Sequence, residues 1–285
     1  MAFTAKTGNS AWAHRPDVAA FHAEDVVPEA LILQASTVSG SIEGDEPSLR
    51  VAYVDDDDAL YVAEGAEVPE ATPALSEAVV FSGRISQLIR VTKEQYRQEL
   101  TSDLLSTSAQ RALIKKADEA FLAQPAPTPP AHGPSTGLLN IPGLVDGGEV
   151  YNDLDVLVDL EAQLQSNGAT PSHVIVDPLG WAALRKLKAA IDSNMSLVGA
   201  GVVDAAPLIL SLPVLVNRNC PPYSGLMIDK TAVVSAVGEV YVDVSTERYF
   251  EHYSIGLMAT WRIGATVVRP ERCGKFTVFD TEGGS

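Results

Sequence analysis

The sequence predicts an α+β protein, and three observations support this class. Apolar residues recur with a helical period over about residues 93–123, which predicts one long helix. Apolar and polar residues alternate from Val79 to Val91, which is typical of a half-buried strand. The remaining short helical and strand-like stretches follow one another without regular βαβ alternation, and such a mixture places a chain in the α+β class.

The composition of the 285 residues limits the class of protein further. Hydrophobic residues make up 46% and charged residues 20%, as in globular proteins. No apolar run approaches the roughly 18–20 residues of a membrane span, and the first residues lack the pattern of a signal peptide. Cys220 and Cys273 allow one bridge at most, and a reduced intracellular protein is the simpler interpretation. The net charge of −17 argues against tight binding of nucleic acid over the whole surface.

The residues before the long helix predict an arm and a hairpin. Residues 1–35 are weakly periodic, so we expect an arm rather than a packed domain. Residues 42–91 predict a long β-hairpin, with strands at 49–54 and 60–63 and a turn made by four consecutive carboxylates. An isolated hairpin is marginal in water. We therefore expect it to lie on another copy of the same chain.

The long helix has a clear start and a clear end in the sequence. Thr92 and Gln95 have the spacing of a capping box, and Pro125 ends the pattern. A helix over about 93–123 is on the order of 45 Å long. After a loop rich in Pro and Gly over residues 124–150, the pattern predicts helices at 154–164 and 181–191 and strands at 174–177, 213–216, 226–229, 240–244 and 255–268.

Charge is distributed unevenly along the chain. Between Glu43 and Glu77 there are eleven acids and one base, Arg50, so this stretch carries more than half of the net charge. The helix region carries several bases. An acidic hairpin laid across a neighbour's basic surface gains mainly in register and specificity. The candidate contact residues between copies are therefore Asp55, Asp56, Asp57, Asp58, Glu64, Glu67, Arg97, Arg111, Lys115 and Lys116.

Several stretches, in their order and spacing, resemble the capsid proteins of tailed bacteriophages of the Hong Kong 97 type. The resemblance covers roughly residues 35–279. It rests on Glu64-Gly65-Ala66-Glu67-Val68-Pro69, Val80-Phe81-Ser82-Gly83-Arg84-Ile85, Val91-Thr92-Lys93-Glu94, Leu104-Leu105-Ser106-Thr107-Ser108, Gly133-Pro134-Ser135-Thr136-Gly137-Leu138-Leu139-Asn140, His173-Val174-Ile175-Val176-Asp177-Pro178, Trp181-Ala182-Ala183-Leu184-Arg185-Lys186-Leu187-Lys188, Leu212-Pro213-Val214, Met258-Ala259-Thr260-Trp261-Arg262 and Val268-Arg269-Pro270.

The resemblance implies a domain plan and a structural role. It implies an N-terminal arm (1–41), an extended β-hairpin loop with a descending strand (42–91), a peripheral domain with a spine helix (92–139), an axial domain (140–225) and a return to the peripheral domain with a C-terminal tail (226–285). It implies a major capsid protein whose copies form the hexamers and pentamers of an icosahedral shell around double-stranded DNA. We expect no enzymatic activity and no cofactor.

The resemblance also implies partners and a location. Because only a short arm precedes the hairpin, we expect either a separate scaffolding protein or none, together with a portal and a decoration protein. We expect no membrane partner and DNA that is enclosed but not tightly bound. The protein is expected in the virion, after assembly in the host cytoplasm. Residues 42–91 contain no Lys, so the lysine–asparagine cross-links of some family members are not expected.

Other interpretations remain open from the sequence. An encapsulin-type nanocompartment shares the fold but encloses cargo enzymes. A hydrolase using Ser135 fits the G-x-S-x-G letters, but that motif needs a strand before it and a helix after it. The four consecutive Asp residues lack the ligand spacing of a calcium loop, and the five His residues lack the HExxH spacing. We expect His173, Cys220 and Cys273 to be structural residues.

Overall fold

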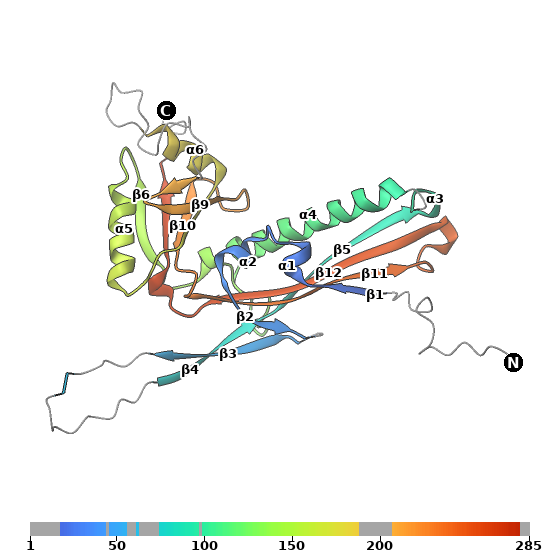
Figure 1. Ribbon diagram of the computed structural model, residues 1–285, viewed down its shortest axis with the longest axis horizontal. Helices are drawn as coiled ribbons and strands as arrows, with labels where there is room; N and C mark the ends of the chain where they lie inside the picture. The colour runs from blue at the N-terminus through green and yellow to red at the C-terminus, as the bar shows by residue number, and fades with distance from the viewer. Residues whose placement is uncertain are drawn as a thin grey trace.

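The computed structural model describes residues 18–43, 46–55, 61–62, 74–96, 99–187 and 207–279. Over these ranges the molecule is elongated and contains two sheets and a ribbon (Figure 1). A five-stranded sheet, here called the long sheet, runs along the molecule beside the longest helix. A six-stranded sheet, here called the end sheet, lies at one end. A two-stranded ribbon projects from the same end region.

The long sheet is built on one antiparallel hairpin. Its strands are β11 (Val233–Ser245) and β12 (Ser254–Val267). On one side β5 (Gly83–Thr92) pairs antiparallel with β12. On the other side β11 pairs antiparallel with β1 (Val18–Phe21) and, at its other end, parallel with β2 (Thr37–Ile42). The predicted alternation at residues 240–244 and 255–268 thus lies within these strands, which makes both strand predictions correct.

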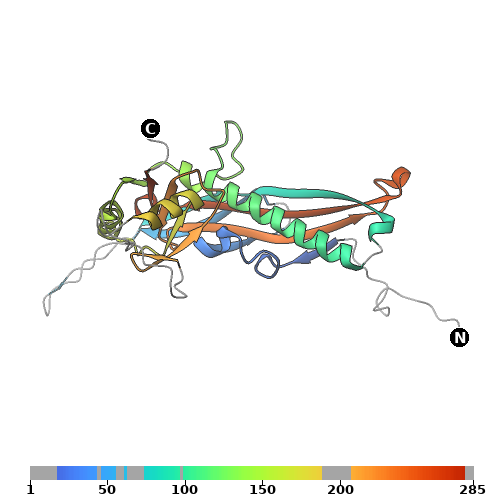
Figure 2. The same ribbon diagram turned by 90° about the horizontal axis from the view of Figure 1, so that it is seen from above.

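The helix α4 (Glu99–Ala123) lies along one face of the long sheet, after the short α3 (Lys93–Tyr96) (Figures 1 and 2). The backbone N–H of Gln95 donates to Thr92 Oγ1 at 3.3 Å, which is half of the predicted capping box. Near its C-terminal end α4 buries Leu113, Ala117, Phe121 and Leu122 in the main core with Trp261 of β12. Leu104, however, is 70% exposed, so the predicted apolar stripe is not buried along its whole length.

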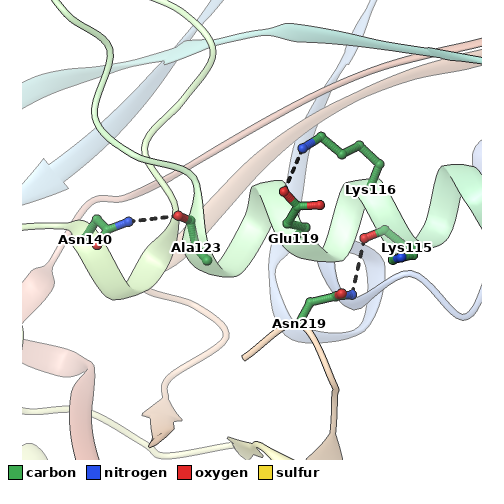
Figure 3. Close-up of polar contacts among 6 residues, drawn as sticks. All are labelled: Lys115, Lys116, Glu119, Ala123, Asn140 and Asn219. Carbon is green, nitrogen blue, oxygen red and sulfur yellow. Dashed lines mark hydrogen bonds and ion pairs between the residues drawn. The ribbon is translucent and has the colours of Figure 1, made fainter. Parts of the chain in front are cut away.

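The C-terminal end of α4 is held by the segment that returns past it. The last carbonyls of a helix lack partners within the helix. Here the side chain of Asn140 donates to the carbonyl of Ala123 at 3.1 Å (Figure 3). It also donates to the carbonyl of Gln124 at 3.0 Å, and Gly137 N–H donates to the same carbonyl at 2.8 Å. A Cβ on Gly137 would lie 2.4 Å from Gln124 N, so only glycine allows this approach. The helix therefore ends where it was predicted to end.

The end sheet has its own core. Its strand order is β6 (Val145–Val150), β13 (Gly274–Val278), β10 (Ser224–Ile228), β7 (His173–Val176), β9 (Leu212–Val216) and β8 (Leu208–Ile209). Two helices, α5 (Asp155–Ser166) and α6 (Pro178–Lys186), pack against it. Their apolar side chains share one cluster with the strands, including Leu157, Leu160, Leu184, Met227 and Phe276.

The helix after β7 begins earlier than predicted. α6 starts at Pro178, because Pro is tolerated in the first helical turn. The Asp177 carboxylate accepts from the N–H groups of Leu179 (2.9 Å) and Gly180 (3.3 Å) and so caps the helix. The prediction placed the start at Trp181. The helix also ends earlier than predicted, at Lys186 with Leu187 as its C-cap, so the predicted extent to residue 191 is wrong.

The prediction of an unpacked arm over residues 1–35 is wrong for its second half. Residues 18–35 form β1, α1 (Ala23–Val26) and α2 (Leu31–Ala35). Val27, Ala30, Leu31, Ile32 and Ala35 are fully or almost fully buried in the main core. The two helices are too short to show a helical period in the sequence.

The predicted hairpin has a different pairing. β3 (Ser48–Asp55) pairs with β4 (Ala74–Phe81), and the register places Asp55 opposite Ala74. The predictions of a tight turn at residues 55–58 and of a partner strand at 60–63 are therefore wrong. Tyr61 and Val62 belong to no strand, and the rest of residues 56–73 lie outside the described residues. The predicted single strand over 79–91 is divided at Ser82, where the chain leaves the ribbon and enters the long sheet as β5.

Candidate functional site

The ribbon formed by β3 and β4 is the first candidate surface, because it leaves the body of the molecule (Figure 1). One of its faces exposes Val54, Leu75 and Val79, and Leu75 is 80% exposed. The pair Arg50–Glu77 lies on the same face, with 3.5 Å between Nη1 and Oε2. Monomeric proteins seldom leave a strand face of this kind uncovered without a partner.

The base of the ribbon is firmly packed. Val80 is fully buried in a small cluster with Ile42, Val234 and Ala236, and Leu49 and Val51 pack against that cluster. Near the other end of the ribbon, one residue before Asp55, the Val54 carbonyl accepts from Arg269 Nη2 at 2.8 Å. The ribbon is therefore packed at its base, held again near its far end, and exposes one apolar face along its length.

Of the predicted acidic contacts, one lies within the described residues. Asp55 is the last residue of β3. Asp56, Asp57, Asp58, Glu64 and Glu67 lie outside the described residues, as does Arg97.

The predicted basic contacts on α4 lie on two sides of the helix. Lys116 Nζ donates to Glu119 Oε1 at 2.8 Å and lines a hollow of about 170 Å³ together with Arg84 of β5. Lys115 and Arg111 instead line a cleft of about 370 Å³ between α4 and the loop after β9. Figure 3 shows Lys116 and Asn219 on different sides of the helix. Lys116 is therefore not part of the cleft.

The cleft contains a third cation, Arg218, which the sequence analysis missed. Arg218 belongs to the loop after β9 and has no charged neighbour in sequence that would have marked it. Within the described residues, none of Arg111, Lys115 and Arg218 has a carboxylate within ion-pair distance. Two acids also line the cleft, Glu29 and Asp118.

Asp118 forms the buried floor of this cleft. Its carboxylate accepts from the Leu31 N–H at 2.8 Å and from Asn217 Nδ2 at 2.7 Å. Burial raises the pKa of Asp118, against the smaller opposing effects of these two hydrogen bonds and of the Arg218 charge. Asn219 Nδ2 donates to the Lys115 carbonyl at 3.2 Å (Figure 3). The loop after β9 is thus fastened to α4 directly beneath the three cations.

A third candidate surface lies at the tip of the β11–β12 hairpin. Arg90 and Arg248 lie over the Tyr249 ring, at 5.1 and 5.6 Å from its centroid. Lys93 lies 5.6 Å from the Phe250 ring and 5.3 Å from the Tyr253 ring. Phe250 is nevertheless 74% exposed. Cations that lie over aromatic faces hold the rings in place, and exposed aromatic rings suit contact with another polypeptide.

The residues of the catalytic and metal alternatives have structural roles. The Ser135 hydroxyl accepts from the Ala265 N–H at 3.1 Å. Ser135 lies in an irregular segment and not at a turn that joins a strand to an α-helix. The strand–turn–helix arrangement of a nucleophile elbow is therefore not formed. In the described part of the chain, no three His, Cys, Asp or Glu side chains gather as a metal site would require. Likewise, no helix there has the length and hydropathy needed to cross a membrane.

His173 lies in the end sheet, and the two cysteines lie in the main core. His173 begins β7, and burial lowers its pKa, with a smaller contribution from Lys230. Cys220 and Cys273 are buried free thiols.

These features define a class of protein before any comparison. A projecting ribbon, a charged cleft and an aromatic tip are the kinds of surface by which an assembling structural protein meets other polypeptides. The model of the Phage capsid family matches residues 23–277. The chain belongs to the phage capsid family. It is a structural major capsid protein of a tailed phage, located in the virion, where many copies form the shell.

Solved structures show the same fold at low sequence identity. The capsid of a native GTA particle is 15% identical, with a TM-score of 0.65 over 87% of this chain and 90% of that chain. A chain from Mycobacterium phage Bobi is 14% identical, with a TM-score of 0.64 over 98% and 96%. A chain from Microbacterium phage Oxtober96 is 14% identical, with a TM-score of 0.65 over 96% of each. A comparison with curated proteins finds no match.

The comparisons confirm the main expectations from the sequence. The α+β fold of the Hong Kong 97 type is correct. The encapsulin and hydrolase alternatives are not favoured, because the family that matches almost the whole chain is that of phage capsids.

Proposed function

We propose that copies of this protein assemble as hexamers and pentamers that close into an icosahedral shell around double-stranded DNA. The ribbon of β3 and β4 is the observation that carries the proposal, since its exposed face and distant end require a neighbour (Figure 1). When one surface of each copy binds a different surface of the next copy, the copies form a closed ring if the rotation between neighbours divides a full turn evenly. Rings of six and of five then need small adjustments of the same contact.

Each part of the chain has a role in this proposal. Residues 42–80 clamp an adjacent copy, residues 140–225 contact neighbours around the axis of each ring, and residues 92–139 with 226–285 form the peripheral body. Two elements cross these boundaries. The end sheet uses β13 from the C-terminal part of the chain, and residues 23–35 pack into the main core.

The other partners belong to the same proposal. A separate scaffolding protein guides assembly in the host cytoplasm, a portal occupies one vertex, and a decoration protein binds the outer surface. The DNA is enclosed without tight binding, because a net charge of −17 repels phosphate.

Shortening the ribbon tests the proposal. Asp55 and Ala74 are opposite each other in the ladder, so an Asn-Gly turn in place of residues 56–73 closes a hairpin with its base intact. We expect a soluble, folded protein that forms no closed shells by electron microscopy. Normal shells from this variant would overturn the proposal.

A control separates reach from side-chain contact. Replacing residues 56–73 by eighteen Gly and Ser residues keeps the length of the segment and removes its side chains. We expect this variant also to fail in assembly, with circular dichroism and unfolding free energy equal to those of the Asn-Gly variant. If it assembles normally, the side chains of the segment are not the contact, and the clamp is limited to β3 and β4.

A further inference from the structure

The cleft between α4 and the loop after β9 is a basic surface shared by the two bodies of the molecule. Arg111 and Lys115 are four residues apart and therefore lie on one side of α4, which packs on the long sheet. Arg218 follows β9 of the end sheet. The three cations thus converge on one cleft of about 370 Å³ from two separate bodies.

The charge inside the cleft is not balanced by its own acids. Asp118 is 4% exposed and its oxygens are occupied by Leu31 and Asn217. Glu29 is exposed and forms no ion pair among the described residues. Three cations against these two carboxylates leave the cleft open to an acidic ligand.

The same chain carries a segment of the matching charge. Residues 56–73 contain six acids, namely Asp56, Asp57, Asp58, Glu64, Glu67 and Glu70, and no Lys, Arg or His. The segment starts and ends at the tip of the ribbon, at Asp55 and Ala74. Eighteen residues that leave and return extend at most about 30 Å beyond that tip.

The geometry points to a neighbouring copy as the source of the acids. The ribbon leaves the molecule on the side of the long sheet that is opposite to α4 (Figure 1). The cleft lies on the α4 side. In a head-to-tail ring this arrangement lets the segment of one copy reach the cleft of the next, while its own cleft stays available for the preceding copy.

We propose that the Arg111–Lys115–Arg218 cleft is the receptor for the acidic segment 56–73 of the adjacent copy, and that its binding fastens the long sheet and the end sheet of the receptor together. The inference rests on the proposed function. The free protein already has one joint here, through Asp118, Asn217 and Asn219. Carboxylates that contact α4 and Arg218 at once add a second joint, so assembly itself makes the receptor copy more rigid.

Charge reversal tests the receptor in the full-length protein. In about 0.05 M salt, where exposed charges are weakly screened, Lys115→Glu with Arg218→Glu is expected to slow shell formation, followed by light scattering, at least about tenfold. Adding Asp56→Lys, Asp57→Lys and Asp58→Lys to the same chain is expected to restore the rate to within about threefold. Lys116→Glu, on the other side of α4, is the control and is expected to leave the rate unchanged.

The outcomes separate the inference from the proposed function. If the reversed cleft assembles at the wild-type rate while the Asn-Gly ribbon variant forms no shells, the receptor is wrong and the ribbon clamp stands. If the reversed cleft fails and the reversed segment does not restore it, the pairing is also wrong. If the Asn-Gly variant itself forms normal shells, the proposed function fails first.

A second measurement does not depend on charge and covers the case in which the reversed cleft does not fold. Asp57→Cys combined with Arg218→Cys is expected to give disulfide-linked multimers on non-reducing gels of assembled shells, and monomers before assembly. Asp57→Cys combined with Lys116→Cys is the control and is expected to stay monomeric on the gel. Shells without linked multimers from the first pair would overturn the receptor.

Discussion

At Asp118 a single buried carboxylate joins three segments that are far apart in the sequence. Asp118 lies on α4. Its carboxylate accepts hydrogen bonds from the N–H of Leu31, the first residue of α2, and from the side-chain amide of Asn217 after β9. A carboxylate that accepts several hydrogen bonds tolerates burial that an unpaired one does not. One side chain therefore links the N-terminal helices, the long helix and the loop that follows β9 of the end sheet.

Removing this carboxylate is expected to destabilise the unassembled protein. Asp118→Ala leaves the buried Leu31 N–H without a partner, so we expect the unfolding free energy to fall by about 3 kcal/mol. Asp159→Ala, on the exposed side of α5, is the control and is expected to change it by less than about 0.5 kcal/mol. Urea unfolding measures both.

The same variant has an expected pH dependence. Burial raises the native pKa of Asp118 above its ordinary value of about 3.9. The native state then binds a proton more readily than the unfolded chain, so the contribution of Asp118 to stability grows as the pH falls from the raised pKa towards about 4. The loss caused by Asp118→Ala is therefore larger near pH 4 than near pH 7. An equal loss at both pH values would contradict a raised pKa.

The two cysteines are expected to be unreactive in the folded protein. Burial raises the pKa of both Cys220 and Cys273 to about 11, and the thiolate is the reactive form. We expect a chromogenic thiol reagent at pH 8 to react at least about 100-fold more slowly with native protein than with protein in guanidinium. Leu75→Cys supplies an exposed control thiol. Immediate reaction of two thiols in the native wild type would contradict the burial.

At the scale of the element, the ribbon combines a fixed base with an exposed face. Val80 is buried among residues of β2 and β11, whereas Leu75, five residues earlier on the same strand, faces solvent. Two strands without a third rarely persist in water. The packing at the base stabilises the ribbon within one chain, and the exposed face is the part that we expect a neighbour to cover.

Two substitutions in β4 separate folding from assembly. Val80→Ala leaves a cavity and is expected to lower the unfolding free energy by about 2 kcal/mol. Leu75→Asn is expected to change it by less than about 0.5 kcal/mol and yet to reduce the yield of shells in electron microscopy. A Leu75→Asn variant that assembles at the wild-type yield would show that this face is not a contact.

At the scale of the whole molecule, charge is separated between the ribbon end and the helix. Six acids without a base lie in residues 56–73, while Arg111, Lys115 and Arg218 share a cleft of the described body. Such a separation favours unlike surfaces on different copies and repels like ones. It directs the order of contact in a ring more than it increases the affinity.

The salt dependence of assembly reports on this separation. Replacing Asp55, Asp56, Asp57 and Asp58 by Asn removes four carboxylates. Since the screening length falls from about 10 Å at 0.1 M to about 3 Å at 1 M salt, the wild-type assembly rate is expected to fall as salt increases, and the variant to show a weaker dependence. Equal dependence in the two proteins would exclude an electrostatic role for these residues.

Some elements were predictable because their signal is local. Thr92 and Gln95 marked the start of the helical region at α3, and Pro125 marked its end, since α4 ends at Ala123. The alternation of residues 255–268 gave β12 almost to the residue. Helical and strand periods depend only on neighbours along the chain, so a single sequence contains them.

Pairings and clusters were decided by the tertiary structure alone. Residues 74–81 rather than 60–63 face β3, because Val80 finds its buried place only against β2 and β11. Residues 23–35 contain no period long enough to detect, yet they fill the main core. Arg218 lies beside Lys115 because the loop after β9 is held on α4 by Asn217 and Asn219.

By itself the sequence determined the local elements, the excess of acid and the resemblance to capsid proteins. Which residues meet depends on contacts between distant segments, whose free energy is set by packing and not by spacing along the chain.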